Sequence, residues 1–264
     1  MPSLKDSSIE KKRILFEFIQ VTPSGIEPKS SKIALETSLS LSVNGENWLT
    51  FQCTPENIEE LAVGFLFNEG VIQKIDEIVT INMCESGDNI DIWLDHSAAR
   101  PAFWIRNSGC YGGNSSKHGY ELSIEPVKPH NPLSVQQVFS LISTFLENQT
   151  PHSESGGVHT SAFAQGDKIL FFKEDIGRHN TFDKIAGHIL LENLPVTSAT
   201  ILTTGRVSSE MIQKAARIKA TFLLSMRSPS AAGIELANEW GITLICSARN
   251  NRVNLFTHSD RVLA

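Results

Sequence analysis

Hydrophobic residues in the second half of the chain fall into short runs that alternate with longer amphipathic stretches. The short runs predict strands, and the stretches between them predict helices. The strands are expected at 169–172, 199–203, 221–225, 242–246 and 253–257, and the helices near 180–192, 208–219 and 229–240. Strands that alternate with helices imply right-handed crossovers and a largely parallel sheet. We therefore expect a three-layer α/β domain over residues 130–264.

Shorter patterns in the first half of the chain indicate a smaller α+β domain over residues 1–129. An alternating apolar run ends at Asn44-Gly45, a dipeptide that is favoured in type I′ hairpin turns. Residues 58–66 have the apolar spacing of a helix, which we expect Thr54 to cap and Gly70 to end.

Two segments between the predicted elements have the composition of loops. Residues 106–119 and 148–157 are rich in Gly, Ser and Asn and contain almost no aliphatic side chains. Between them, Ser134 and Gln137 have the spacing of a capping box, which predicts that a helix begins there.

The composition is that of a folded, weakly acidic chain. Of its 264 residues 41% are hydrophobic, and 23 Lys and Arg against 29 Asp and Glu give a net charge of −6. This composition excludes a largely disordered chain, and it lacks the basic excess of a nucleic-acid-binding protein. No apolar run predicts a membrane span or a signal peptide, and the four cysteines are too widely spaced for a secreted disulfide framework. We expect a cytoplasmic protein with no nucleic-acid or membrane partner.

Arginines concentrate in the turns that follow the predicted strands. Five lie there: Arg178, Arg206, Arg227, Arg249 and Arg252. Open α/β sheets bind ligands beyond the carboxyl ends of their strands, and arginine binds phosphate through two parallel hydrogen bonds. The set predicts a site for a phosphate-bearing ligand; the alternative is that these side chains only solvate the sheet edge. The common glycine-rich nucleotide motifs are absent from the sequence.

Cys110 is the cysteine with the most reactive surroundings in the sequence. It lies in the glycine-rich loop, where Lys117 and His118 would help to stabilise a thiolate. The alternative is an ordinary exposed loop cysteine. Cys246 lies in an apolar strand and Cys53 just before a predicted helix, so we expect both to be packing residues.

Ionisable residues are unusually dense between Glu174 and Lys184. Such density is typical either of an ion-pair network or of one wall of a functional site. His159 precedes an apolar strand, and it is either a structural residue or part of a site. No cysteine or histidine spacing resembles a zinc site, so we expect no structural metal.

Four motifs together give the chain a resemblance to a known family. They are ELAVGFLFNEG at 60–70, GGVH at 156–159, EDIGRHN at 174–180 with Asp183-Lys184, and a C-terminal group made of TGR at 204–206, EMIQKAA at 210–216, residues 249–252 and FTH at 256–258. On these motifs the chain resembles the FdhD family from about residue 30 to its C-terminus.

Members of this family are sulfur carrier proteins that formate dehydrogenase activity requires. The resemblance implies a sulfurtransferase that accepts sulfur from a cysteine desulfurase as a persulfide on Cys110. It implies that this sulfur passes to a molybdenum (or tungsten) bis-pterin guanine dinucleotide cofactor, bound as a substrate, before the cofactor enters formate dehydrogenase. It also implies a homodimer, and a cytidine-deaminase-like fold without zinc for residues 130–264.

The resemblance also implies which residues bind the cofactor. The family's guanine-dinucleotide-binding segment matches Ser247, Ala248, Arg249, Asn250, Asn251 and Arg252. With Arg206, the arginines of this segment are expected to hold the cofactor's phosphates. His159, Arg178 and His179 are expected to line the same pocket.

The chain departs from the family pattern at one position of the cysteine loop. The family loop usually carries C-x-x-C, and the second cysteine is replaced here by Gly113. One thiolate is enough to hold a persulfide, whereas a second thiol would release the sulfur by forming a disulfide. Two alternatives follow: sulfur delivery with an external reductant, or an altered member of the family.

Two other functions are alternatives at this stage. A chaperone that holds the cofactor without sulfur chemistry would keep its function after Cys110→Ala, whereas a sulfur carrier would lose it. A deaminase-like hydrolase would contain stoichiometric zinc.

Overall fold

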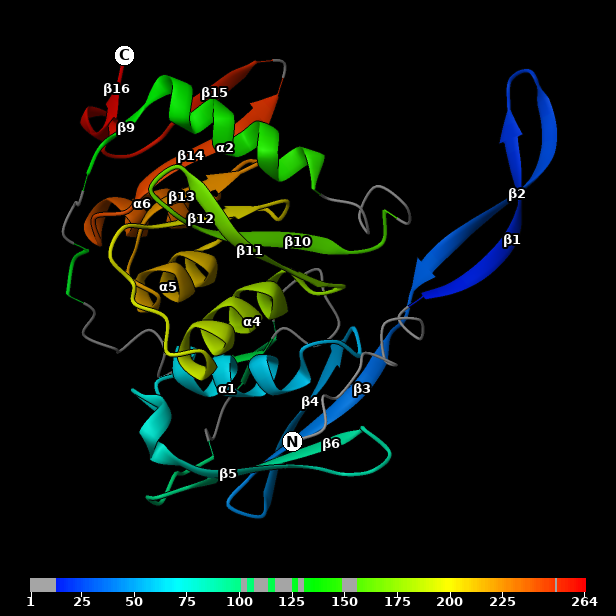
Figure 1. Ribbon diagram of the computed structural model, residues 1–264, viewed down its shortest axis with the longest axis vertical. Helices are drawn as coiled ribbons and strands as arrows, with labels where there is room; N and C mark the ends of the chain where they lie inside the picture. Colours follow the sequence, from blue (N-terminus) through cyan, green and yellow to red (C-terminus); the bar gives the residue numbers. More distant parts are fainter. Residues whose placement is uncertain are drawn as a thin grey trace, which may run out of the picture.

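The structure is a computed structural model that describes residues 13–100, 104–106, 114–116, 125–127, 131–148, 156–249 and 251–264 (Figure 1). It contains a four-stranded sheet from the first half of the chain and a six-stranded sheet from the second half. Helices α1 (Ile58–Asn68) and α4 (Arg178–Leu191) lie between the two sheets. The chain is therefore a mixed α/β protein.

The four-stranded sheet has the order β4-β3-β6-β5. Its strands are β3 (Thr37–Val43), β4 (Glu46–Cys53), β5 (Ile78–Met83) and β6 (Asn89–Leu94). Asn44 and Gly45 connect β3 to β4 with φ values of 51° and 80°, as a type I′ turn requires, so the predicted hairpin is confirmed. Alternate side chains of β3 and β6 pack under α1 in one apolar core.

Helix α1 ends as predicted but begins differently. Gly70 has a φ of +77°, and its N–H and that of Val71 reach back to the carbonyl oxygens of Phe67 and Leu66, which closes the helix. The prediction that Thr54 caps the helix is wrong, because the residue before α1 is Asn57, in the left-handed region. Thr54 instead donates its N–H and its hydroxyl to the Asp175 carboxylate, 121 residues away.

The six-stranded sheet has the order β11-β10-β12-β13-β14-β15. Its strands are β10 (His159–Gln165), β11 (Lys168–Asp175), β12 (Ala199–Thr203), β13 (Ala220–Ser225), β14 (Thr243–Arg249) and β15 (Arg252–Leu255). Only β12, β13 and β14 are parallel neighbours, so the expectation of a largely parallel sheet is wrong. The tight turns that join β10 to β11 and β14 to β15 are too short for a crossover helix, which forces antiparallel pairing there.

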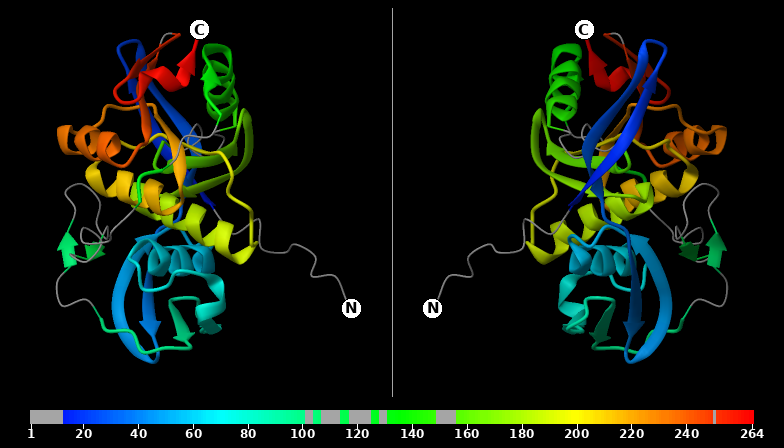
Figure 2. Two further views of the ribbon diagram at one scale, coloured as in Figure 1. Left: turned by 90° about the vertical axis from the view of Figure 1, so that its left-hand side faces the viewer. Right: turned by 90° about the vertical axis from the view of Figure 1, so that its right-hand side faces the viewer.

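Helices cover both faces of this sheet. Helix α2 (Val135–Glu147) packs on one face, and α4, α5 (Ser209–Arg217) and α6 (Ala231–Glu239) pack on the other (Figure 2). The capping box at the start of α2 is confirmed: Gln137 N donates to Ser134 Oγ (3.2 Å), and Ser134 N donates to Gln137 Oε1 (2.9 Å).

The two sheets are joined by a close crossing of α1 and α4. A Cβ atom on Gly64 would lie 1.8 Å from the Asp183 carbonyl oxygen, and one on Gly187 would lie 1.9 Å from the Glu60 carbonyl oxygen. Only glycine allows the two backbones to approach so closely. The crossing fixes α4, and hence the residues at its start, relative to the first half of the chain.

A long antiparallel hairpin projects from the rest of the molecule. Its strands are β1 (Arg13–Thr22) and β2 (Gly25–Ala34), and it extends away from both sheets at the right of Figure 1. Seven of its large apolar side chains are exposed: Leu15, Phe16, Phe18, Ile19, Val21, Ile26 and Ile33. We refer to β1 and β2 together as the arm.

The remaining strands are short. β7 (Trp104–Arg106) pairs with β8 (Asn114–Ser116), and β9 (Leu133–Ser134) pairs with β16 (Val262–Leu263). β7 ends at the first residue of the segment 106–119 that was predicted as a loop, and β8 lies within that segment, so the prediction is wrong for residues 106 and 114–116. Single-turn helices occupy Ile75–Glu77 and Ser259–Arg261.

Candidate functional site

The turn between β11 and α4 is built around the buried carboxylate of Asp175. Gly177 N and Asn180 Nδ2 each donate to its Oδ1 at 2.8 Å, and Lys184 Nζ lies 2.6 Å from its Oδ2. Asp175 and Lys184 have no exposed side-chain surface, so these contacts replace the water that both charges lose. The arrangement fixes where α4 begins.

A second buried ion pair holds the middle of α4. Asp183 accepts from Lys214 Nζ on α5, at 2.6 Å for Oδ2, and from Asn68 Nδ2 on α1 at 2.8 Å. The dense ionisable stretch therefore forms an ion-pair network, which was one of the two interpretations left open by the sequence. Ile176 and Arg178, from the same stretch, also line a cavity.

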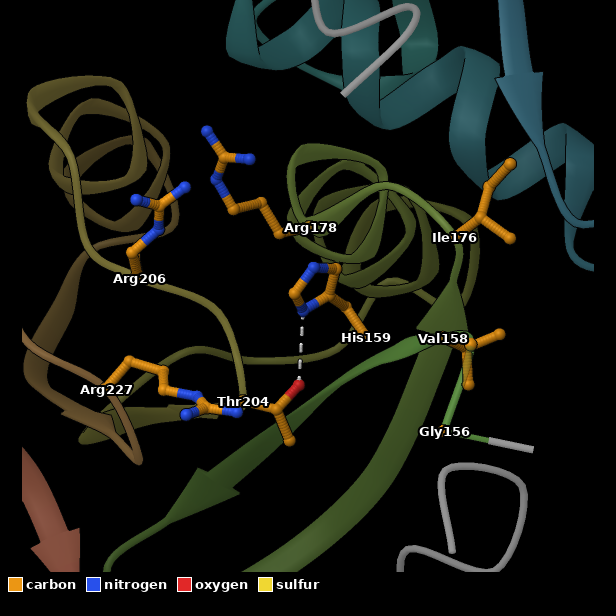
Figure 3. A pocket seen from close by; sticks show the side chains of 9 residues that line it. Gly156, Val158, His159, Ile176, Arg178, Thr204, Arg206 and Arg227 are labelled. Atoms are coloured by element: carbon orange, nitrogen blue, oxygen red, sulfur yellow. Dashed lines mark hydrogen bonds between the residues drawn. The ribbon is translucent and has the colours of Figure 1, made fainter. Parts of the chain in front are cut away.

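The cavity has a volume of about 440 Å³ and lies beside the carboxyl ends of β12 and β13 (Figure 3). It is lined by Gly156, Gly157, Val158, His159, Ile176, Arg178, Thr204, Arg206 and Arg227. These residues come from the start of β10, the start of α4 and the loops that follow β12 and β13. Residues from four separate parts of the second half of the chain thus meet at this edge of the sheet.

Three arginines face this cavity from three different elements. Arg178 is the first residue of α4, Arg206 follows β12 and Arg227 follows β13, and Figure 3 shows all three on one side of the cavity. Arg178 is buried, whereas Arg206 and Arg227 are exposed. Three guanidinium groups repel one another, and an anion between them removes that repulsion and accepts several charge-assisted hydrogen bonds. The arrangement suits a ligand with more than one phosphate.

His159 lies between the arginines and the opposite wall. Its Nδ1 is 3.4 Å from Thr204 Oγ1, which also accepts from the N–H of Thr160 at 3.1 Å. Val158 and Ile176 form the wall across from the arginines in Figure 3. The cavity therefore has a cationic side and an apolar side, with a titratable ring between them.

The segment predicted to bind a nucleotide lies at the same edge of the sheet. Ser247 leaves the β14–β15 ladder with a φ of +58°, its N–H donates to the Arg227 carbonyl oxygen (3.1 Å), and its hydroxyl lies 3.3 Å from Ser228 Oγ. A non-glycine residue in this conformation is strained, and such strain is concentrated at functional sites. Ser247 thus joins the predicted segment to the loop that carries Arg227.

The other predicted residues of this segment are placed as follows. Ala248 is half-buried, the Arg249 backbone pairs with that of Arg252, Asn251 makes the turn with a φ of 54°, and Arg252 is exposed. Asn250 and the side chain of Arg249 lie outside the described residues. Of the predicted cofactor-binding residues that the structure describes, Arg206 lines the cavity and those of 247–252 do not.

The predicted nucleophile, Cys110, also lies outside the described residues, as do Gly113, Lys117 and His118. The described cysteines have other surroundings. Burial raises the pKa of Cys53 and of Cys246 to about 12, and both are fully buried, so the prediction that they are packing residues is confirmed. The Cys84 thiol lies 3.0 Å from the Asp88 carboxylate in a turn.

His179 does not line the cavity, although it was expected to. It is buried, and its Nε2 lies 3.0 Å from Glu210 Oε2. Burial lowers the pKa of His179, and the carboxylate of Glu210 opposes that shift. Sequence reasoning missed this pair, because nothing in the spacing of the two residues along the chain indicates that the starts of α4 and α5 touch.

Two kinds of feature are absent from the described part of the chain. No group of three or more His, Cys, Asp and Glu side chains in the described ranges is arranged to hold a metal ion. No helix within those ranges is both long enough and apolar enough to span a membrane.

Comparison with known proteins identifies the family. Residues 34–263 match the model of the FdhD/NarQ family. The sulfur carrier protein FdhD of Bacillus subtilis is 32% identical over 242 residues (90% of this chain and 92% of that protein), and that of Shouchella clausii is 30% identical over 265 residues (97% and 98%). The crystal structure of a candidate formate dehydrogenase accessory protein from Desulfotalea psychrophila superposes with a TM-score of 0.77 at 28% identity, covering 95% of this chain and 99% of that one. The chain belongs to the FdhD/NarQ family.

Proposed function

We propose that this chain is a sulfur carrier, and specifically a sulfurtransferase, for formate dehydrogenase maturation. In this proposal Cys110 accepts sulfur from a cysteine desulfurase and the protein passes it to a molybdenum (or tungsten) bis-pterin guanine dinucleotide cofactor. Relatives that cover about nine-tenths of the chain or more carry the name sulfur carrier protein FdhD, and this supports the carrier role.

The observation that carries the proposal is the cavity with three arginines. A bis-pterin guanine dinucleotide contains two pyrophosphate groups, and Arg178, Arg206 and Arg227 offer paired N–H donors from three directions. The apolar side made by Val158 and Ile176 suits a flat ring system attached to those phosphates. Ser247 supports the assignment of 247–252 to the same ligand, because it joins that segment to the Arg227 loop.

The proposed acceptance step needs one thiolate and no oxidant. The Cys110 thiolate attacks the outer sulfur of the desulfurase persulfide, a new S–S bond forms on Cys110, and the desulfurase cysteine leaves as a thiolate. Passing this sulfane sulfur on as sulfide requires two electrons. Because Gly113 replaces the second loop cysteine, we propose that an external thiol attacks the Cys110 sulfur and forms a mixed disulfide with it, while the S–S bond to the outer sulfur breaks and that sulfur leaves as sulfide. A second thiol then reduces the mixed disulfide and restores the Cys110 thiolate.

Mass spectrometry of the intact chain tests the carrier function. After incubation with a cysteine desulfurase and cysteine, a reducible adduct of about 32 Da is expected on Cys110 and absent from Cys110→Ala. Cys246→Ser is the matched control, since Cys246 is buried and should carry no adduct in the native chain. An adduct confined to another cysteine contradicts the assignment.

A maturation assay separates the carrier from a chaperone. The Cys110→Ala variant is expected to bind the cofactor normally and to leave formate dehydrogenase inactive. Full dehydrogenase activity with this variant supports the chaperone instead, and stoichiometric zinc in the purified chain supports a deaminase-like hydrolase.

Three further proposals concern the arrangement of the domains and the location of the protein. We propose a cytidine-deaminase-like arrangement for residues 130–264, a separate smaller domain over 1–129, and a cytoplasmic location. The helices on both faces of the six-stranded sheet support the first of these.

We also propose that the chain forms a homodimer through the arm. A two-stranded hairpin is only marginally stable by itself in water, and this one exposes Val21 at 72% and Ile26 at 73%. Its two strands contain ten residues each, and a stable interface involves about 20–30 residues from each partner. Sedimentation should show a dimer for the wild-type chain and a monomer for Val21→Lys/Ile26→Lys; a wild-type monomer contradicts the proposal.

A further inference from the structure

We propose that the buried pair of His179 and Glu210 is a positioning pair, which sets the distance between Arg178 and Arg206 for anion binding. This inference rests on the proposed function, since it assumes that the cavity binds phosphate groups. Neither residue lines the cavity, so both act through the arginines next to them in the chain.

The pair connects the two elements that carry these arginines. His179 follows Arg178 directly on α4, and Glu210 lies four residues after Arg206, as the second residue of α5. The distance from His179 Nε2 to Glu210 Oε2 is 3.0 Å, and the two side chains are 5% and 9% exposed. The contact therefore links the start of α4 to the start of α5 in a space that water hardly reaches.

The charges around His179 explain why this link is well defined. Glu210 attracts a proton to the ring, whereas burial and the cations of Arg178 and Lys214 disfavour the protonated ring. Lys214 is itself paired with Asp183. The Glu210 carboxylate, 3.0 Å from Nε2, is thus the partner that opposes the effect of burial on the ring.

Gly205 provides a second contact between the same two elements. A Cβ atom on Gly205 would lie 3.1 Å from Arg178 Cβ, so the stem of Arg178 rests against the loop just before Arg206. Residues at the ends of β12 and β13 hold that loop in place. Gly205 N donates to Thr203 Oγ1 (3.1 Å), and Ser225 Oγ donates to the Gly205 carbonyl oxygen (2.7 Å). The backbone next to Arg206 is thus fixed to the sheet, and the His179–Glu210 pair fixes the start of α4 to it.

This arrangement lowers the cost of binding an anion. Arg178 and Arg206 repel each other, so without the link the two helix starts are able to shift apart within the limits set by the Gly205 contact and the Asp183–Lys214 pair. Holding them in place before the ligand arrives removes that ordering cost from the binding free energy. A loss of the link should weaken binding even though no contact to the ligand is removed.

Titration calorimetry with inorganic pyrophosphate tests the inference. We expect His179→Ala and Glu210→Ala to weaken binding about tenfold, which is a typical coupling between neighbouring groups. The conservative variants His179→Gln and Glu210→Gln keep a polar group at each position and should restore most of the affinity. His188→Gln is the matched control. His188 also lies on α4 and also contacts a glutamate, Glu60 of α1, but it lies near the other end of the helix.

A double-mutant cycle separates positioning from general damage to the fold. In an Arg178→Ala background, His179→Ala should have no further effect on pyrophosphate affinity, since its effect passes through Arg178. An equal loss in both backgrounds, or unchanged affinity in His179→Ala, overturns the inference while pyrophosphate binding by the wild-type chain upholds the proposed site. A wild-type chain that does not bind pyrophosphate overturns the proposed site and the inference together. If His179→Ala fails to fold, Glu210→Ala with its Glu210→Gln rescue gives the same test.

Discussion

The two ends of helix α4 carry similar side chains in different surroundings. At its start, His179 meets Glu210 in a nearly dry space under the arginines. Near its end, His188 is 24% exposed, lies 2.9 Å from Glu60, and its ring centroid is 4.2 Å from that of Phe171. The same type of pair is buried at one end of the helix and stays in contact with solvent at the other. The two pairs therefore differ in burial rather than in residue type, and we propose a positioning role for the buried pair alone.

The largest expected effect on stability comes from Gly187, the residue next to His188 of the His188–Glu60 pair. Gly187→Val places side-chain atoms where the Glu60 carbonyl oxygen lies, so α1 and α4 have to separate. We expect a loss of more than about 4 kcal/mol of unfolding free energy, measured with urea. Gly87→Ala is the control: its φ is +73° but no atom lies nearby, and it should lose only about 1 to 2 kcal/mol. Equal losses in the two variants would show that the close crossing does not matter.

The next largest effect concerns the buried charges at the start of the helix. Asp175→Ala leaves Lys184 charged and fully buried without its carboxylate, and we expect a loss of about 3 to 5 kcal/mol. Glu60→Ala removes the partner of Lys173 near the other end, where Glu60 is 14% exposed and His188 still contacts Lys173, and should cost about 1 to 2 kcal/mol. Similar urea midpoints for the two variants would contradict the contrast between the two ends.

Acid should act on the buried histidine at the start of the helix. Burial lowers the pKa of His179 below its ordinary value of 6.5, so between the two values the unfolded chain binds more protons than the folded one. The stability that depends on a neutral His179 is complete above about pH 6.5 and declines as the pH falls below it. Urea midpoints between pH 7.5 and 5 should decline less steeply in His179→Gln than in the wild-type chain; parallel curves would show that this ring does not contribute.

The smallest effect is expected at the exposed pair. His188→Gln removes a ring that is 24% exposed, while Lys173 keeps its contact with Glu60 at 2.6 Å. We expect a change of less than about 1 kcal/mol in unfolding free energy. A larger loss would show that the two ends of α4 are more alike than their burial indicates.

Local sequence signals predicted the elements well where a turn or cap depends on neighbouring residues. Asn44-Gly45 and the Ser134–Gln137 box are of this kind, because their hydrogen bonds and dihedral angles are set within a few residues. Thr54 shows the limit of such reasoning. Its short polar side chain suits a cap, yet it binds Asp175, whose position depends on how the two halves of the chain pack.

The candidate site was predicted in part for a similar reason. The rule that ligands bind beyond the carboxyl ends of parallel strands predicted that Arg178, Arg206 and Arg227 lie at one edge of the sheet. The structure confirms that these three arginines line one cavity. The burial of His179 and its pairing with Glu210 depend on contacts between helices that no spacing along the chain reports. The role of Cys110 stays a prediction, since it lies outside the described residues.

The glycine crossing between α1 and α4 has a consequence for how the molecule is able to move. Backbone atoms of the two helices are in direct contact, without side chains between them that would change rotamer and permit sliding. One helix packs on the four-stranded sheet and the other on the six-stranded sheet, so the crossing excludes a hinge between the two sheets at this point. Any widening of the arginine cavity for a large ligand then has to come from movement of the loops that line it, while the two helices and the two sheets keep their relative positions.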